Sequence, residues 1–171
     1  EPYEGATVLE AQKGAYYTPI TALDFEALYP SIMMAHNLCY STLVMDDAKY
    51  GNVPGVTYET FTVGSRTYTF AQNIPSLLPS ILSELKQFRK KAKRDMAAAT
   101  GGMKEVYNGK QLAYKVSMNS IYGFTGAGKG ILPCVPIAST TTCRGRGMIE
   151  ETKTYVEANF PGAKVRYGDT D

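Results

Sequence analysis

Three aspartates stand where two predicted strands end, and carboxylates in such positions can bind metal ions. Asp24 follows residues 16–23, a run of β-branched and aromatic side chains that predicts a strand. Asp169 and Asp171 follow a second predicted strand, residues 163–167, at a Gly-Asp turn. Because Mg²⁺ prefers oxygen ligands and paired Mg²⁺ ions support phosphoryl transfer, the pattern indicates a two-cation site. The alternative for Asp24 is a local role in a turn or a helix cap.

The residues after the first aspartate predict an abrupt change from strand to helix. Pro30 supplies no backbone N–H and disfavours a helical conformation at Tyr29, so we expect Pro30 to stop the extended segment. Ser31 is then expected to cap a short helix over residues 32–37.

A basic pair of helices is predicted in the middle of the chain. Apolar side chains recur at helical spacing over residues 78–88, which predicts an amphipathic helix. Gly101 and Gly102 end it, and a second helix follows, so the two form an αα-hairpin. Lys and Arg number nine against three Asp and Glu over residues 84–115, whereas the whole chain carries a net charge of +2. This hairpin presents either a solvated face or localisation signal, or a surface that binds phosphates.

Polar side chains on these two helices are spaced so that they share helix faces. Arg89 and Lys93 are four residues apart on the first helix, and Lys115 and Asn119 are four apart on the second. Tyr122 follows close behind, either as a contact for a ligand or as an ordinary packing residue.

The remaining elements follow from turn signals and local patterns. We expect a β-hairpin around Gly64 and Ser65, because β-rich runs flank that pair. The expected elements are hairpin strands over residues 57–63 and 66–70, a strand-like segment over 131–137, and a helix from an N-cap cluster at 139–142 to about residue 158.

Three smaller features carry no site. Cys39, Cys134 and Cys143 lack metal-ligand spacing and are expected to be reduced, buried thiols of an intracellular protein. Asp46 and Asp47 are expected in a surface turn, because no third acid accompanies them at a useful spacing. No apolar run reaches the roughly 18 residues of a membrane span.

One segment imitates a different kind of site. Residues 123–130 match Gly-x-x-x-x-Gly-Lys, the start of a P-loop, but Gly130 replaces the Ser or Thr that holds Mg²⁺. The segment also follows a predicted helix, not a strand. Two alternatives therefore stay open: a P-loop nucleotide hydrolase, which the residue types disfavour, and a non-enzymatic nucleic-acid-binding module, which leaves the three aspartates unexplained.

Three segments together resemble the palm motifs of family B DNA polymerases. Asp24–Ser31 is similar to the first motif, Asp-Phe-x-x-Leu-Tyr-Pro-Ser, and Tyr167–Asp171 is similar to the third, Tyr-Gly-Asp-Thr-Asp. Lys115–Gly123 is similar to the second, Lys-x-x-x-Asn-Ser-x-Tyr-Gly. The motifs keep the family's order over nearly the whole chain. Residues 33–40 and 122–127 are most similar to delta-type replicative polymerases, which occur in eukaryotes and in large DNA viruses, including viruses of algae.

The resemblance implies an α+β fold: a polymerase palm sheet with packed helices and an inserted helical-hairpin fingers element. It implies a first palm part with a β-hairpin-like insertion at 1–72, a fingers hairpin at 73–122, and a second palm part at 123–171 that ends in the catalytic turn. Because the chain starts without Met and stops on an implied metal ligand, we expect an internal fragment of a larger protein, inactive in isolation.

The resemblance also implies roles for single residues. Asp24 and Asp171 would be the principal ligands of two Mg²⁺ ions, Asp169 a weaker catalytic ligand, and the carbonyl of Phe25 would complete a metal shell. Tyr29 would stack under the sugar of the incoming nucleotide and reject a 2′ hydroxyl by its bulk. The residues implied to bind the dNTP are Leu28, Tyr29, Arg89, Lys93, Lys115 and Asn119.

The implied function is template-directed DNA polymerase, a nucleotidyl transferase that adds dNTPs to a primer 3′ end in DNA replication. Tyr122 would face the nascent base pair and contact DNA together with Gly123. The implied partners are primer–template DNA, dNTPs and, through regions outside this chain, a sliding clamp and accessory subunits. The implied location is intracellular, in the nucleus of a eukaryotic cell or of a virus-infected host cell, without membrane attachment.

Overall fold

The computed structural model describes residues 3–170, which form five helices and four strands. The strands make two separate antiparallel pairs, so the predicted α+β class is confirmed. In chain order the elements are β1 (Val8–Leu9), α1 (Leu28–Ala35), α2 (Asp47–Tyr50), β2 (Tyr58–Val63), β3 (Arg66–Ala71), α3 (Leu77–Ala98), α4 (Gly102–Gly126), α5 (Val135–Asn159) and β4 (Gly168–Asp169).

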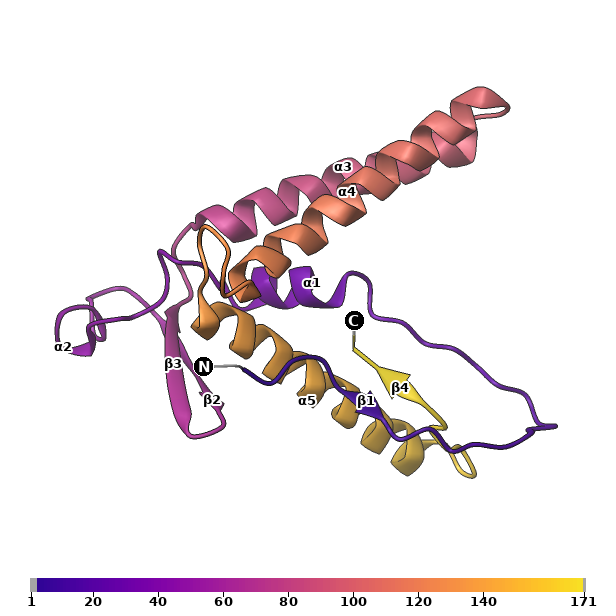
Figure 1. The fold of residues 1–171 in the computed structure, drawn as a ribbon, viewed down its shortest axis with the longest axis horizontal. Helices are drawn as coiled ribbons and strands as arrows, with labels where there is room; N and C mark the ends of the chain where they lie inside the picture. The colour runs from indigo at the N-terminus through magenta and orange to yellow at the C-terminus, as the bar shows by residue number, and fades with distance from the viewer. Residues whose placement is uncertain (1–2, 171) are drawn as a thin grey trace.

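Helices α3 and α4 form the long hairpin that the sequence predicts (Figure 1). They pack along their length, with the ring centroids of Phe88 and Tyr114 5.8 Å apart. Gly101 makes the turn at a φ of +58°, a conformation that glycine adopts without steric cost. Helix α4 continues unbroken past residue 122, so the predicted boundary between fingers and palm falls inside a helix.

The main core lies where α1 meets the base of this hairpin and the start of α5. Ile32 and Met33 of α1 are buried there, together with Leu82 of α3, Met118 of α4 and Ile137 of α5. Full burial of such a side chain stabilises the fold by about 1.5–3 kcal/mol. Helix α1 is therefore held by three other helices, and this packing fixes the segment that follows Asp24.

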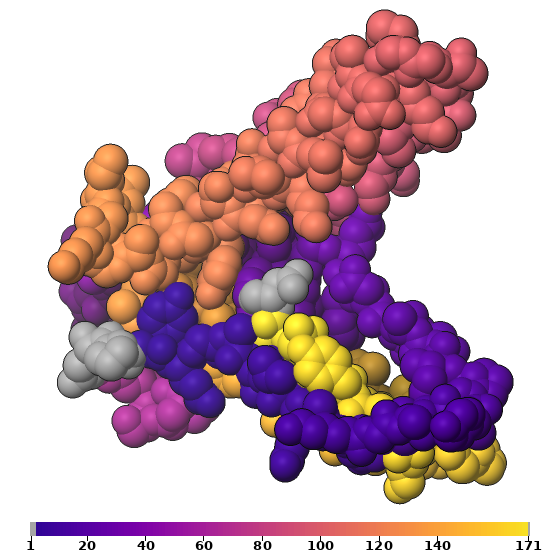
Figure 2. Space-filling view, turned by 45° about the vertical axis from the view of Figure 1, so that its right-hand side comes forward, coloured from indigo at the N-terminus to yellow at the C-terminus, as the bar shows by residue number. Residues whose placement is uncertain are grey.

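A space-filling view shows a hollow between the hairpin α3–α4 and the segment that carries β1 and β4 (Figure 2). Residues that lead into α1 lie at the back of this hollow. The segments of the first and third motifs therefore border the same concave face.

Strands β2 and β3 form the β-hairpin predicted over residues 57–63 and 66–70, with Val63 opposite Arg66. Gly64 begins the turn at a φ of +62°, as a type II′ turn requires of its first central residue. This prediction is confirmed because the hairpin depends on a local turn and on neighbouring residues.

The strand predicted over residues 16–23 is wrong. The segment is irregular, and Tyr17 and Leu23 expose 98% and 74% of their surface. A strand needs a neighbour that exchanges backbone hydrogen bonds with it, and among residues 3–170 no strand pairs with this segment. Its β-branched and aromatic composition is therefore not sufficient to form a strand.

The prediction for the start of the first helix is also wrong, because α1 begins at Leu28 and includes Tyr29. Pro30 lies in the first turn, where its missing N–H would have no intrahelical partner in any case. Ser31 is not the cap, since its hydroxyl donates instead to the carbonyl of Glu26 at 2.9 Å.

Helix α5 begins at Val135, so both the strand-like segment at 131–137 and the N-cap cluster at 139–142 are wrong predictions. Pro136 lies in the first turn, which tolerates proline. Residues 139–142 lie within α5, and their side chains are buried against the rest of the protein. The hydroxyl of Thr141 donates to the carbonyl of Ile137, four residues earlier, at 2.7 Å. Such bonds satisfy the hydroxyls of Ser139, Thr141 and Thr142 without ending the helix.

The last strand is Gly168–Asp169, not residues 163–167. Its partner β1 offers two residues, with Val8 opposite Asp169 and Leu9 opposite Gly168. Pairing with β1 therefore places the Gly-Asp pair in the strand, whereas the sequence predicts a turn there.

The smaller predictions have mixed outcomes. Asp46 and Asp47 are on the surface, but they begin the short helix α2 instead of forming a turn. Cys39, Cys134 and Cys143 are free thiols, but only Cys39 of the three is buried, so the predicted burial is wrong for Cys134 and Cys143. None of the described helices combines the length and apolar character that a membrane crossing requires.

Candidate active site

The first and second motifs meet through two tyrosine rings. Tyr29, in the first turn of α1, is 5% exposed, and its ring centroid lies 4.6 Å from that of Tyr122 on α4. Tilted aromatic pairs of this kind add about 0.5–1.5 kcal/mol beyond the burial of their area. Burial raises the pKa of Tyr122, as does its contact with Tyr3, whose hydroxyl oxygen lies 3.5 Å away. Both rings are therefore held in place by packing.

Helix α5 supports the first and third motifs on one face. Gly145 packs against Tyr29 so closely that an added Cβ would lie 2.9 Å from the ring. Ile149, one turn later, packs against Gly168, where an added Cβ would lie 2.9 Å from its Cδ1. Because residues four apart share a helix face, the two contacts lie about 6 Å apart along α5. Motifs from opposite ends of the chain therefore converge on this helix.

Thr170 stands between two aspartates of the third motif and is anchored to the N-terminal segment. Its hydroxyl accepts a hydrogen bond from the backbone N–H of Thr7 at 2.9 Å, and its own N–H donates to the carbonyl of Thr7 at 2.9 Å. Thr170 is 5% exposed. The sequence carries no signal for this pair, because the contact joins opposite ends of the chain.

Arg146 of α5 holds the same N-terminal segment. Its guanidinium donates to the carbonyls of Glu4 at 2.9 Å and Gly5 at 2.7 Å, and it pairs with the Glu4 carboxylate at 3.2 Å. The hydroxyl of Thr142, one turn earlier, also donates to the Glu4 carbonyl at 2.9 Å. The segment that precedes β1 is therefore fastened to the helix that supports the motifs.

The predicted metal ligands lie partly within the described residues. Asp24, Phe25 and Asp169 are exposed, whereas Asp171 lies outside the described residues. Asp169 accepts a hydrogen bond from the Tyr167 hydroxyl at 3.0 Å, which raises the pKa of Tyr167. Within residues 3–170 no three His, Cys, Asp or Glu side chains form a group that could hold a metal ion.

The two described carboxylates nevertheless suit a divalent cation. Within residues 3–170 neither Asp24 nor Asp169 forms an ion pair with Lys or Arg. Exposed carboxylate oxygens without a cationic partner are the ligands that Mg²⁺ prefers. The chemistry of the donors therefore fits Mg²⁺.

The start of α1 suits a phosphate. Ala27 adopts a left-handed conformation at a φ of +48°, and the helix begins at the next residue, Leu28. The N–H of Leu28 lies in the first turn, where no intrahelical acceptor is available, at the positive end of the helix dipole. Such an end attracts anionic groups.

The predicted phosphate-binding side chains are distributed along the hairpin and do not meet at one point. Arg89 links the helices, with its Nε 3.3 Å from Oε1 of Gln111. Lys93 lies one turn from Arg89 toward the tip, and Lys115 lies one turn from Gln111 toward the base. The helical rise therefore separates the two lysines by about 12 Å along the hairpin. Both are exposed, and neither forms an ion pair within residues 3–170.

Helix α4 presents a polar stripe that leads from the hairpin toward the tyrosine pair. Lys115, Asn119 and Gly123 are spaced four residues apart and are all exposed. Tyr122, next to the last of them, turns inward to Tyr29. The second motif therefore divides its residues between an exposed stripe and the core.

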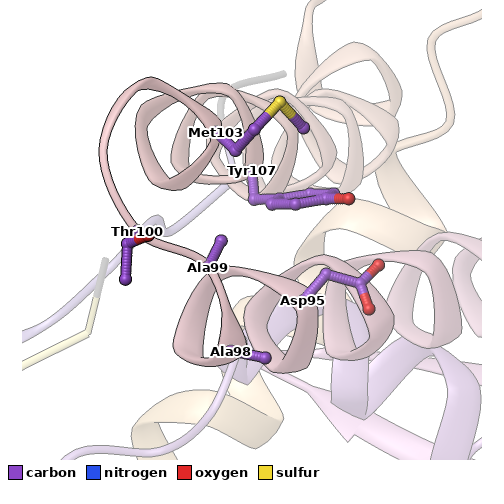
Figure 3. Close-up of a pocket in the computed structure, with 6 residues that line it drawn as sticks. All are labelled: Asp95, Ala98, Ala99, Thr100, Met103 and Tyr107. Carbon is purple, nitrogen blue, oxygen red and sulfur yellow. The ribbon is translucent and has the colours of Figure 1, made fainter.

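A pocket of about 480 Å³ lies at the hairpin tip, away from the three motifs (Figure 3). Its charged lining residue, Asp95, already pairs with Lys91 at 2.8 Å. The pocket therefore offers no group for the predicted chemistry. It is lined by Asp95, Ala98, Ala99, Thr100, Met103 and Tyr107.

The glycine-rich segment at 123–130 does not have P-loop geometry. A P-loop joins a strand to the start of a helix, whereas this segment begins inside α4 and continues into an irregular connection. The next helix, α5, starts at Val135, several residues after Lys129. The structure therefore disfavours the P-loop alternative.

The site and fold define a class of protein in which motifs far apart in sequence are gathered beside a basic helical hairpin. The family profile described as DNA polymerase family B matches residues 1–171, and the chain belongs to that family. The predicted resemblance is therefore confirmed.

Relatives from a virus and from eukaryotes match the chain over almost its whole length. The chain is 48% identical to the DNA polymerase of Paramecium bursaria Chlorella virus NY2A over 99% of this chain and 20% of that protein. It is 49% identical to the DNA polymerase delta catalytic subunit of Candida albicans, covering 100% of this chain and 17% of the subunit. The corresponding subunit of Arabidopsis thaliana is 50% identical over 99% of this chain and 16% of its own length. The chain thus spans a fifth or less of these relatives.

Proposed function

We propose that the protein containing this chain is a template-directed DNA polymerase that adds dNTPs to a primer 3′ end in DNA replication. The observation that carries this proposal is the packing of Tyr29 against both Tyr122 and Gly145. It supports the function because it gathers the first two motifs at α1, while Ile149 holds the third motif one turn away. Membership of DNA polymerase family B supports the same activity.

We propose that the aspartates of the first and third motifs hold two Mg²⁺ ions. Asp24 and Asp171 would be the principal ligands, Asp169 a weaker one, and the carbonyl of Phe25 would complete a shell. Mg²⁺, when bound, supplies positive charge that activates the attacking hydroxyl and stabilises the leaving oxygens. The exposure of Asp24 and Asp169 supports these roles.

The incoming dNTP would be bound from two sides. The N–H of Leu28 would donate to the triphosphate from the start of α1. The hairpin would supply fixed positive charge, which matters most where negative charge gathers in the transition state. Lys93 and Lys115 lie about 12 Å apart along the hairpin, which supports contacts to different phosphates of an extended triphosphate. The hairpin residues in these roles are Arg89, Lys93, Lys115 and Asn119.

Selection of deoxynucleotides is assigned to Tyr29. A ring that rejects a 2′ hydroxyl by bulk must not move aside, and Tyr29 is packed against α4 and α5. Tyr122, which packs against the ring of Tyr29, would face the nascent base pair. Gly123, exposed on α4, would let the DNA approach closely.

The wider assignments rest on the family. Residues 1–72 and 123–171 would be two parts of a palm, and residues 73–122 the fingers. Primer–template DNA would be the substrate, with a sliding clamp and accessory subunits bound through regions outside this chain. The location would be intracellular, in the nucleus of a eukaryotic or virus-infected cell, because relatives include delta catalytic subunits and a viral polymerase.

The test is Mg²⁺-dependent primer extension by the full-length protein, with ATP hydrolysis followed in the same reactions. Asp24→Asn and Asp171→Asn should each abolish incorporation at saturating dNTP, because each removes the charge of a principal metal ligand. Asp47→Asn is the matched control: this acid is exposed on α2 and should be dispensable.

Other results would favour the alternatives. Substantial extension by Asp24→Asn would remove that residue from the metal site. ATP hydrolysis without extension would favour the P-loop alternative. A folded wild-type protein that binds DNA but shows neither activity would favour a binding module, for which the basic hairpin α3–α4 would be the contact surface.

A further inference from the structure

Asn37 follows α1 in a conformation that few residues adopt. Its φ is +50°, and the N–H of Leu38 donates to the carbonyl of Met33 at 3.0 Å, the bond that closes a Schellman motif. Glycine and asparagine adopt this left-handed conformation more readily than other residues. The backbone therefore explains a preference for either residue, but it does not explain a buried side chain.

The buried amide of Asn37 is bonded to the segment that enters α3. Its Oδ1 accepts a hydrogen bond from the hydroxyl of Ser76. Its Nδ2 carries two hydrogens and lies within hydrogen-bond distance of three backbone carbonyls, those of Ala71 at 2.9 Å, Ile74 at 2.9 Å and Gln72 at 3.2 Å, so one hydrogen is shared between two of them. We call these five residues the Asn37 clamp. The clamp ties the end of α1 to the beginning of the hairpin α3–α4.

The side chain of Ser76 bonds to Asn37 instead of capping its own helix. Ser76 is the N-cap residue of α3, where a serine hydroxyl commonly accepts a hydrogen bond from the helix's own first turn. Its side chain makes no such bond and donates to Asn37 instead. The start of α3 is therefore fixed by its attachment to α1.

Hydrogen bonds of neighbouring residues reinforce the clamp, and its three carbonyl acceptors require a donor at position 37. Gln72 donates through Nε2 to the carbonyl of His36 at 2.9 Å, and Thr42 donates through Oγ1 to the carbonyl of Asn37 at 2.6 Å. Asn37 itself is 9% exposed. An aspartate there would set a carboxylate against three carbonyl oxygens, and a glycine would leave them without this donor.

We propose that Asn37 is a positioning residue that fixes the angle between α1 and the hairpin α3–α4. It thereby sets where the hairpin's phosphate-binding side chains lie relative to Leu28. Arg89 stands about 18 Å along α3 from its first residue, so a small tilt at the base displaces it appreciably. The kinetic consequence rests on the proposed polymerase function, whereas the mechanical connection does not.

The test compares Asn37→Gly and Asn37→Asp with Asn73→Gly in the full-length protein. Glycine keeps the left-handed backbone and removes the amide, whereas aspartate keeps the shape and removes the donors. Asn73 is the matched control because its side chain also makes two backbone bonds, to Gly55 at 2.7 Å and from Thr57 at 2.8 Å, but both lie in the loop before β2. Each variant is measured by amide hydrogen exchange and by steady-state incorporation of a dNTP.

In Asn37→Gly we expect faster exchange confined to the end of α1 and to the first hydrogen-bonded amides of α3, which begin at Ser80. We also expect kcat/KM for the dNTP to fall about tenfold, mainly through KM, because misplaced binding groups weaken orientation. Asn37→Asp should show the same pattern more strongly, and Asn73→Gly should show neither effect. Unchanged exchange in a folded Asn37→Gly protein would overturn the proposal, and so would acceleration spread evenly over the chain.

Ser76→Ala serves if Asn37→Gly does not fold, since it removes one clamp bond and no cap bond. Faster exchange at the start of α3 in this variant supports the clamp, and unchanged exchange overturns it. A wild-type protein that does not extend primers would refute the polymerase function, while the exchange pattern would still decide the clamp. A wild-type protein that extends primers, with unchanged KM in Asn37→Gly, would refute the positioning role alone.

Discussion

The ring of Tyr29 lies directly on the backbone of Gly145, at a place where any larger residue would touch Cε1 of the ring at 2.9 Å. Tyr122 packs against the same ring, with its centroid 4.6 Å away. The tyrosine assigned to sugar selection is therefore enclosed by α4 and α5. A side chain that selects by bulk must be rigid, and this enclosure provides the rigidity.

Replacement of Gly145 tests this contact. Gly145→Ala should destabilise the protein by about 1–3 kcal/mol, because the added methyl overpacks a closed site. Urea unfolding of the full-length protein measures the loss. Gly147→Ala is the control on the same helix, where the added Cβ would meet the flexible end of Arg144 at 3.4 Å. Equal stability of the two variants would contradict the close contact.

Replacement of Tyr29 tests nucleotide selection. Tyr29→Ala should admit ribonucleotides, because it removes the bulk that opposes a 2′ hydroxyl, whereas Tyr29→Phe should keep the preference for dNTPs. The ratio of kcat/KM for dNTP and rNTP measures the effect. Because loss of a large buried ring costs about 3–5 kcal/mol, folding must be checked first. A folded Tyr29→Ala protein with an unchanged ratio would refute the role.

Removal of a hairpin charge tests phosphate binding. Lys115→Ala should raise the apparent KM for dNTP roughly tenfold or more, because a hydrogen bond from a charged group contributes about 1.5–3 kcal/mol. Lys49→Ala is the control, since that lysine is exposed on α2. If the two variants gave the same KM, Lys115 would belong to a merely solvated face. Arg89 is a less clean probe because it also bonds to Gln111.

The anchor of the third motif can be tested by a pair of substitutions at Thr170. Thr170→Val leaves the N–H of Thr7 without its acceptor at a half-buried position, and loss of such a hydrogen bond costs about 0.5–1.5 kcal/mol. Thr170→Ser keeps the hydroxyl and should behave as wild type. We expect Thr170→Val to melt earlier and to need more Mg²⁺ for extension, since its neighbours are implied metal ligands. Identical melting of the two variants would exclude the anchor.

The elements that were predictable from sequence are those that depend on local residues. The hairpin α3–α4 follows from apolar spacing and from Gly101, and the β-hairpin follows from the turn at Gly64. Both bring together segments that are adjacent in the chain, so a turn and two flanking patterns are sufficient to define them.

The wrong predictions share a different cause. Residues 16–23 have the composition of a strand but no pairing partner among the described residues. Residues 139–142 have the composition of a helix cap but lie buried inside α5. In each case the outcome depends on what lies beside the segment in space, which local propensity does not contain.

Local patterns in the sequence were sufficient to identify the three motifs, their family, the two hairpins and the candidate chemical groups. The packing of Tyr29 on Gly145, the anchoring of Thr170 to Thr7 and the connection of α1 to α3 through Asn37 were visible only in the folded chain. A motif can be recognised from the sequence because its residues are neighbours in the chain. A contact between distant residues arises from the packing of whole elements, and it leaves no pattern at either position.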